Sequence, residues 1–107
     1  MAAMDKRQQF SGMVQEHQAI TQQIAALQGQ LSELEATVDY VKSQPEDRAI
    51  YRNAGAVLVE VDDRASLQND LKSTIERVSL ALERYVTREN EIKAAYETLA
   101  KELEGSK

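Results

Sequence analysis

The side chains that could carry chemistry are few in this sequence and form no recognisable catalytic set. The chain has one histidine, His17, and no cysteine. Protein zinc sites usually take three or four ligands from His, Cys and carboxylates, so the alternative of a metal site at His17 lacks its other ligands. The sequence shows no nucleophilic Ser, His and Asp set, no phosphate-binding loop and no paired carboxylates on a rigid cleft. We therefore predict a protein that is not an enzyme and that uses no cofactor or metal.

The charge of the chain disfavours two further classes of function. Its 107 residues include 13 Lys and Arg and 18 Asp and Glu, a formal net charge of −5. Binding to nucleic acid phosphates requires clustered basic residues, which no stretch provides. No run of about 18 apolar residues could cross a membrane. Because the absence of cysteine fits a reducing compartment, we expect a soluble cytoplasmic protein that binds neither nucleic acid nor a membrane.

The helices that must position any binding surface are predicted by the regular spacing of the apolar residues. In the first part of the chain they recur every 3.5 residues on average, about the spacing of a coiled-coil seam. Nine of the ten seam positions are apolar, which predicts a helix over about 5–43. The seam positions are Phe10, Met13, His17, Ile20, Ile24, Leu27, Leu31, Leu34, Val38 and Val41.

A second array with the same period predicts a helix over about 64–104, again with nine of ten positions apolar. The two arrays match in reverse order, which an antiparallel hairpin of helices requires and a parallel pair of chains does not. The predicted layers are Val41 with Leu71, Val38 with Ile75, Leu34 with Val78, Leu31 with Leu82, Leu27 with Tyr85, Ile24 with Glu89, Ile20 with Ile92, His17 with Tyr96, Met13 with Leu99, and Phe10 with Leu103.

Two of these layers contain a polar residue. His17 faces Tyr96, and an interhelical hydrogen bond between them could fix the register of the two helices. Glu89 faces Ile24, where its carboxylate must reach toward solvent.

Residues 42–70 interrupt the heptads and predict a β-hairpin over about 49–61. Pro45 ends the first helix because it removes a backbone donor and disfavours helix before it. Residues 49–52 and 57–61 are predicted strands, and residues 53–55 supply Asn and Gly for the turn. We expect the valines at 57, 59 and 61 on one face and Ile50 and Leu58 elsewhere. Asp63 or Ser66 can cap the second helix.

An isolated two-stranded hairpin is marginal in water, and both of its edges are open to pairing. We therefore predict that the hairpins join several chains, giving a small β-barrel or joined sheets with coiled coils projecting from it. The alternative is a monomer in which the hairpin folds onto the end of the coil. The expected oligomerisation residues are Ile50, Tyr51, Val57, Leu58, Val59 and Val61.

The hairpin segment 50–61 resembles that of β-type prefoldin subunits. That family typically shows an apolar residue, Tyr and a basic residue, two variable residues, Gly, and then an alternating apolar strand. Tyr51, Gly55 and the run at 58–61 match this pattern, and the helix lengths extend the resemblance over essentially the whole chain. The resemblance implies one prefoldin-like domain over residues 1–107: an all-α fold with a small β element, a long antiparallel two-helix coiled coil with one β-hairpin at the bend. α-type subunits carry two hairpins, so the single hairpin favours the β type.

The resemblance also implies a function and partners. It implies a hexamer of two α and four β subunits, joined through hairpins into a double β-barrel. It implies capture of unfolded polypeptides at the coiled-coil tips and their delivery to a group II chaperonin without nucleotide hydrolysis.

The predicted client-binding residues lie where the first and last turns of the chain meet. Methionine is flexible and polarisable, so it adapts to varied apolar partners. Two alternatives remain open: these residues only close the coil, or the chain is a structural adaptor for one folded partner. The expected tip residues are Met4, Phe10, Met13, Val14, Leu99 and Leu103.

Overall fold

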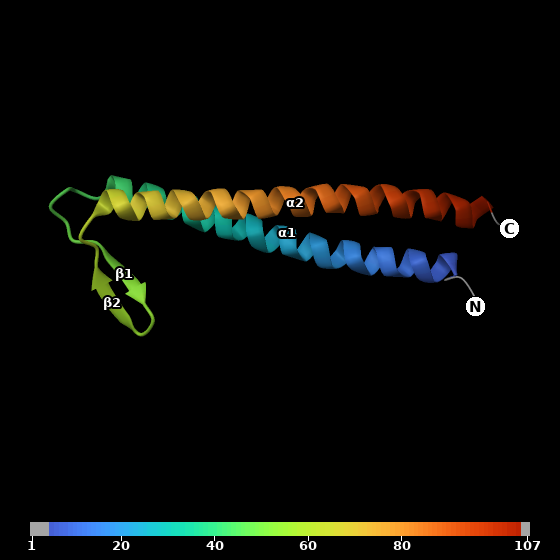
Figure 1. Ribbon diagram of the computed structural model, residues 1–107, viewed down its shortest axis with the longest axis horizontal. Helices are drawn as coiled ribbons and strands as arrows, with labels where there is room; N and C mark the ends of the chain where they lie inside the picture. The colour runs from blue at the N-terminus through green and yellow to red at the C-terminus, as the bar shows by residue number, and fades with distance from the viewer. Residues whose placement is uncertain (1–4, 106–107) are drawn as a thin grey trace. The chain divides into compact units, whose positions relative to one another are not determined.

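The computed structural model describes residues 5–105 of the chain. Its elements follow in the order α1 (Lys6–Ser43), β1 (Tyr51–Ala54), β2 (Val57–Glu60) and α2 (Arg64–Gly105), as Figure 1 shows. The predicted fold class, two long antiparallel helices with one β-hairpin, is confirmed. The chain falls into two compact units. Unit 1 combines the residues up to Gln28 with those from Leu80 onward, and unit 2 is Gly29–Ser79.

Both helices begin at an aspartate that caps their first turn. Asp5 Oδ1 accepts the backbone N–H of Arg7 at 3.1 Å. Asp63 Oδ1 accepts those of Ala65 and Ser66 at 3.0 and 3.3 Å, so Asp63 is the cap of α2. Each cap satisfies backbone donors that the helix itself leaves without a partner.

In unit 1, α1 and α2 pack through a small apolar core. Ile20, Ile24 and Ile92 are buried, and Met13, Leu82 and Tyr96 pack against them. Ile92 is the most buried of the core side chains, with 3% of its surface exposed. The cluster joins Ile20 with Ile92, in agreement with the register predicted from the two heptad arrays.

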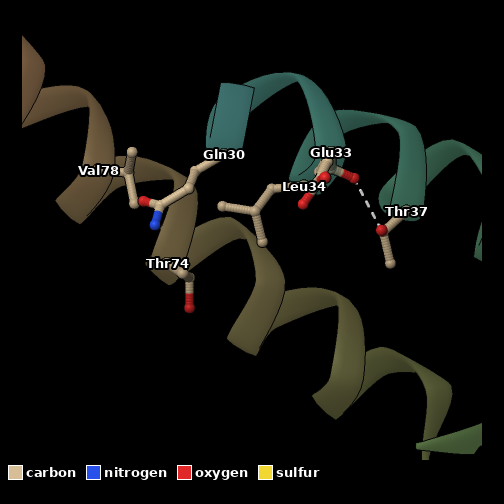
Figure 2. A pocket seen from close by; sticks show the side chains of 6 residues that line it. All are labelled: Gln30, Glu33, Leu34, Thr37, Thr74 and Val78. Atoms are coloured by element: carbon tan, nitrogen blue, oxygen red, sulfur yellow. Dashed lines mark hydrogen bonds between the residues drawn. The ribbon is translucent and has the colours of Figure 1, made fainter. Parts of the chain in front are cut away.

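In unit 2, α1 and α2 are also paired antiparallel, but the α2 side chains there are only half-buried or exposed. Figure 2 shows Leu34 reaching from α1 toward α2, on which Thr74 and Val78 lie beside the same shallow groove. Val38 is buried, and its backbone carbonyl accepts a hydrogen bond from Gln68 Nε2 at 3.2 Å. The Leu34–Val78 layer is therefore placed as predicted.

The hairpin belongs to unit 2, and in the sequence it connects α1 to α2. Its strands are antiparallel, and Tyr51 pairs with Glu60 while Ala54 pairs with Val57. The turn is thus the two residues Gly55 and Ala56, whereas the predicted turn was residues 53–55. Gly55 has a φ of 64°, and no other described residue has a positive φ. A positive φ at only the first of two turn residues is the geometry of a type II′ turn.

This register decides which side chains share a face, because paired residues in an antiparallel sheet project to the same side. Val61 N–H donates to Ile50 O at 2.7 Å, which extends the ladder by one pair. Ile50 therefore lies on the face of the valines, and its expected place elsewhere was wrong. The opposite face carries Tyr51 and Leu58.

The positive φ at Gly55 gives a first prediction. An alanine Cβ there would meet no atom within 4 Å, so the only penalty is the left-handed backbone, about 1–2 kcal/mol. We expect Gly55→Ala to weaken hydrogen-exchange protection of the hairpin about fivefold or more, and Gly55→Asn, which tolerates this region, to weaken it less. Equal protection in all three proteins would show that the turn does not limit hairpin formation.

Candidate assembly and client-binding surfaces

The two strands of the hairpin expose four large apolar side chains: Tyr51, Val57, Leu58 and Val59. We call Ile50, Val57, Val59 and Val61 the valine face; Ile50 and Val61 are half-buried, and Val57 and Val59 are 58% and 45% exposed. On the opposite face Tyr51 and Leu58 are also exposed, Leu58 by 67%. All eight strand residues are exposed, so no element within residues 5–105 covers the sheet. Exposed apolar groups on a sheet with two open edges are the features of an unfilled interface.

A second surface lies in unit 1, where the first turns of α1 meet the last turns of α2. We call residues 5–14 with 96–105 the terminal end. Lys6 Nζ lies 3.4 Å from Glu102 Oε2, which joins the outermost turns of the two helices. The Phe10 ring meets the Tyr96 ring edge to face, with 6.0 Å between centroids and an interplanar angle of 89°.

The predicted client-binding residues differ in their accessibility at this end. Leu99 is buried with 6% of its surface exposed, so it closes the contact between the helices. The other predicted residues that the structure describes are half-buried, so they could pack between the helices and also offer apolar surface to a partner. They are Phe10, Met13, Val14 and Leu103. Met4, which we also expected here, lies outside the described residues.

A polar layer crosses the core of unit 1. The His17 ring lies edge to face on Tyr96 with 5.5 Å between centroids. Its polar partner is Glu89, whose Oε2 lies 3.6 Å from His17 Nε2 and 3.4 Å from Thr21 Oγ1. The expected hydrogen bond from His17 to Tyr96 is therefore replaced by a ring contact, and the polar contact runs to the carboxylate one layer away. This links both irregular seam positions in one cluster.

The geometry of Glu89 gives a second prediction. Its side chain is 28% exposed, so its contact with His17 contributes little to stability, while a leucine there would add to the apolar seam. We expect Glu89→Leu to raise the free energy of unfolding by about 1 kcal/mol, since apolar replacement of partly buried ion pairs is often stabilising. Thermal unfolding followed by circular dichroism measures this change.

The matched control for this substitution is Glu91→Leu. Glu91 is exposed, and its ion pair is with Arg88 of the same helix, at 3.3 Å. Its replacement should change stability by less than about 0.5 kcal/mol. A loss of stability in Glu89→Leu beyond that of the control would show that the His17–Glu89 contact holds the helices together.

The interhelical ion pair between Arg88 and Glu16 was not anticipated from the sequence. Arg88 donates to Glu16 Oε1 from Nε at 3.1 Å and from Nη2 at 2.9 Å. The hydrogen bond and charge of Glu16 raise the pKa of Arg88, and Glu91 adds a smaller contribution. Glu16 and Arg88 each precede a seam residue, the flanking position where coiled coils place charged pairs. Their positions in the heptads were therefore the signal that could have predicted this pair.

Tyr85 departs from its predicted seam position. It remains 36% exposed and lines a surface groove with Arg84 and Arg88, although its layer partner Leu27 is buried. A tyrosine can pack its ring against a seam while its hydroxyl stays in water, which accounts for this exposure.

Between residues 5 and 105, no three His, Cys, Asp or Glu side chains gather in a way that could hold a metal ion. Over the same range, neither helix is apolar enough along its length to cross a membrane.

Comparison with known proteins decides the family. The family model for prefoldin subunits matches residues 4–106, nearly the whole chain. The chain belongs to the prefoldin subunit family. A curated prefoldin subunit beta from Methanothrix thermoacetophila is 26% identical over 98 residues, which cover 92% of this chain and 81% of that protein.

A solved prefoldin structure agrees with this assignment at the level of fold. The crystal structure of the prefoldin beta subunit from Thermococcus strain KS-1 matches with a TM-score of 0.85 at 22% identity. The match covers 94% of this chain and 88% of that one. The resemblance to a β-type prefoldin subunit is therefore confirmed, and the chain is a subunit of a prefoldin chaperone.

Proposed function

We propose that this subunit is an ATP-independent chaperone component that captures unfolded polypeptides at the terminal end and passes them to a group II chaperonin. It does so in the cytoplasm, in a hetero-hexamer with α-type prefoldin subunits and other copies of itself. The observation that carries this proposal is the placement of accessible apolar side chains in two separate units: the hairpin in unit 2 and the terminal end in unit 1.

The hairpin supports the assembly half of the proposal. Its valine face and both strand edges lack a partner within the described chain. Strand pairing with further hairpins would satisfy the free backbone groups, and closure into a barrel would remove the edges altogether. The valine face then forms the apolar inner layer, while Tyr51 and Leu58 contact neighbouring subunits from the other face.

The terminal end supports the capture half. Phe10, Met13, Val14 and Leu103 keep part of their apolar surface accessible there. An unfolded polypeptide exposes apolar side chains that a folded protein buries, and contact with these residues would remove both surfaces from water. This exchange requires no nucleotide, because binding is driven by apolar surface alone.

The buried position of Leu99 favours a second candidate, a structural adaptor whose terminal end is closed. One assay distinguishes the chaperone subunit from the structural adaptor. The chain, assembled with an α-type subunit, is added without ATP to an unrelated denatured protein, and aggregation is followed by light scattering. A chaperone subunit suppresses aggregation at stoichiometric concentration, whereas an adaptor leaves the scattering unchanged. A folded coiled-coil protein at the same concentration serves as the control.

A further inference from the structure

Arg64, the first residue of α2, makes an unusual set of contacts. Its guanidinium donates to three backbone carbonyls of a single segment: Gln44 O at 3.1 Å, Pro45 O at 2.6 Å and the carbonyl of Arg48. Among the described residues no carboxylate pairs with it. Arg64 is thus held by main-chain oxygens that any sequence would supply at this place.

These three carbonyls belong to the chain that leaves α1 for the hairpin. α1 ends at Ser43, so Gln44 O is one of the acceptors that the end of a helix leaves free, where positive charge is favoured. The same segment is tightened by a bond from Arg48 N–H to Pro45 O at 3.1 Å and one from Arg48 Nη1 to Gln44 Oε1 at 3.0 Å. Arg64 therefore docks onto an ordered turn.

The contact joins the two connections that carry the hairpin. One connection runs from α1 to Ile50, and the other runs from Val61 to α2. The first bond of the ladder, Val61 N–H to Ile50 O, closes them on the hairpin side, and Arg64 closes them on the helix side. The base of the hairpin is thus a small closed ring of contacts rather than two independent linkers.

We propose that Arg64 is a positioning residue that holds the hairpin in the orientation needed for subunit assembly. The inference rests on the proposed assembly role of the hairpin, although Arg64 itself lies outside the valine face. Two free connections would let the hairpin sample many directions, and fixing them before assembly reduces the conformational entropy lost on binding. Arg64 prepares the interface without contacting the partner.

The test compares three variants of the full chain assembled with an α-type subunit. Arg64→Ala removes all three bonds, Arg64→Lys keeps the charge and part of the bonding, and Arg77→Ala is the control. Arg77 is an exposed arginine of α2 in the same unit, and it donates to Thr74 Oγ1 within the helix at 3.2 Å. The dissociation constant of the assembly is measured together with hydrogen exchange at the Val61 amide and at a helical amide, that of Ile75.

We expect Arg64→Ala to weaken assembly about tenfold or more, given the loss of three hydrogen bonds to carbonyls. We expect faster exchange at Val61, an unchanged rate at Ile75 and partial recovery in Arg64→Lys. Assembly equal to that of Arg77→Ala, or equal acceleration at Val61 and Ile75, would overturn the inference. If Val59→Asp, a charge placed on the valine face itself, also leaves assembly intact, the proposed role of the hairpin fails instead.

Discussion

Replacing Val59 with aspartate should release the chain from its hetero-oligomer. Val59 lies in the middle of the valine face, paired with Arg52 and flanked on the same face by Val57 and Val61. An ionised carboxylate moved from water into an apolar interface costs several kcal/mol, of which a cross-strand pair with Arg52 on the same face would recover only about 0.2–1 kcal/mol. We expect the subunit association constant to fall by about 100-fold or more, which corresponds to roughly 2.7 kcal/mol.

Sedimentation velocity of the chain mixed with an α-type subunit measures this effect directly. Because Val59 is 45% exposed in the single chain, the substitution should leave the helices folded, and circular dichroism should show unchanged helix content. Leu80→Asp is the matched control, since Leu80 is exposed on α2 and lies outside the hairpin. An oligomer that survives Val59→Asp as well as Leu80→Asp would exclude the hairpin as the joint.

The double substitution Phe10→Ser with Leu103→Ser should remove most of the client-holding activity while the oligomer persists. Both residues are half-buried at the terminal end, in unit 1, whereas the hairpin is in unit 2. Burying one such side chain fully contributes about 1.5–3 kcal/mol. If client binding uses about half of that from each residue, the concentration needed for half-maximal suppression should rise about tenfold or more.

Light scattering of a denatured client measures the suppression, and sedimentation confirms that the assembly remains. The same two changes at exposed apolar positions elsewhere in unit 1, Leu80→Ser with Val86→Ser, control for a general loss of hydrophobicity. Equal suppression by the two double variants would show that Phe10 and Leu103 only close the helix pair.

The pairing of the helices could be predicted from the sequence because it depends on a long-range pattern. Ten seam positions in each array constrain one register, and a single polar exception such as Glu89 does not change it. What the pattern could not show is how that exception is satisfied. His17 and Thr21 both lie near the Glu89 carboxylate, and only side-chain geometry reveals this.

The hairpin was predicted as an element but with its turn misplaced. Asn53 and Gly55 can both adopt a positive φ, so composition alone could not choose between them. The error matters because side chains alternate between faces along a strand, and a shift of one residue exchanges the faces. That is why Ile50 was assigned away from the valines with which it shares a face.

Arg64 shows a different limit of sequence reasoning. Its partners are backbone carbonyls, which leave no mark in the residue types at 44–48. The pair between Arg88 and Glu16, by contrast, could have been predicted from the positions of both residues beside the seam. Side-chain pairs follow from periodicity, whereas contacts to the backbone of an irregular segment require its coordinates.

Client capture at the terminal end is tested most directly by mapping the residues of the subunit that an unfolded polypeptide contacts. The chain has no cysteine, so single cysteines can carry a photoreactive group without other changes. Val14→Cys places the group at the terminal end, and Arg77→Cys places it on α2 in unit 2. With a cysteine-free α-type partner and a denatured client, the account predicts strong crosslinking from position 14 and little from position 77. Equal crosslinking from both positions, or crosslinking only from position 77, would contradict client capture at the terminal end.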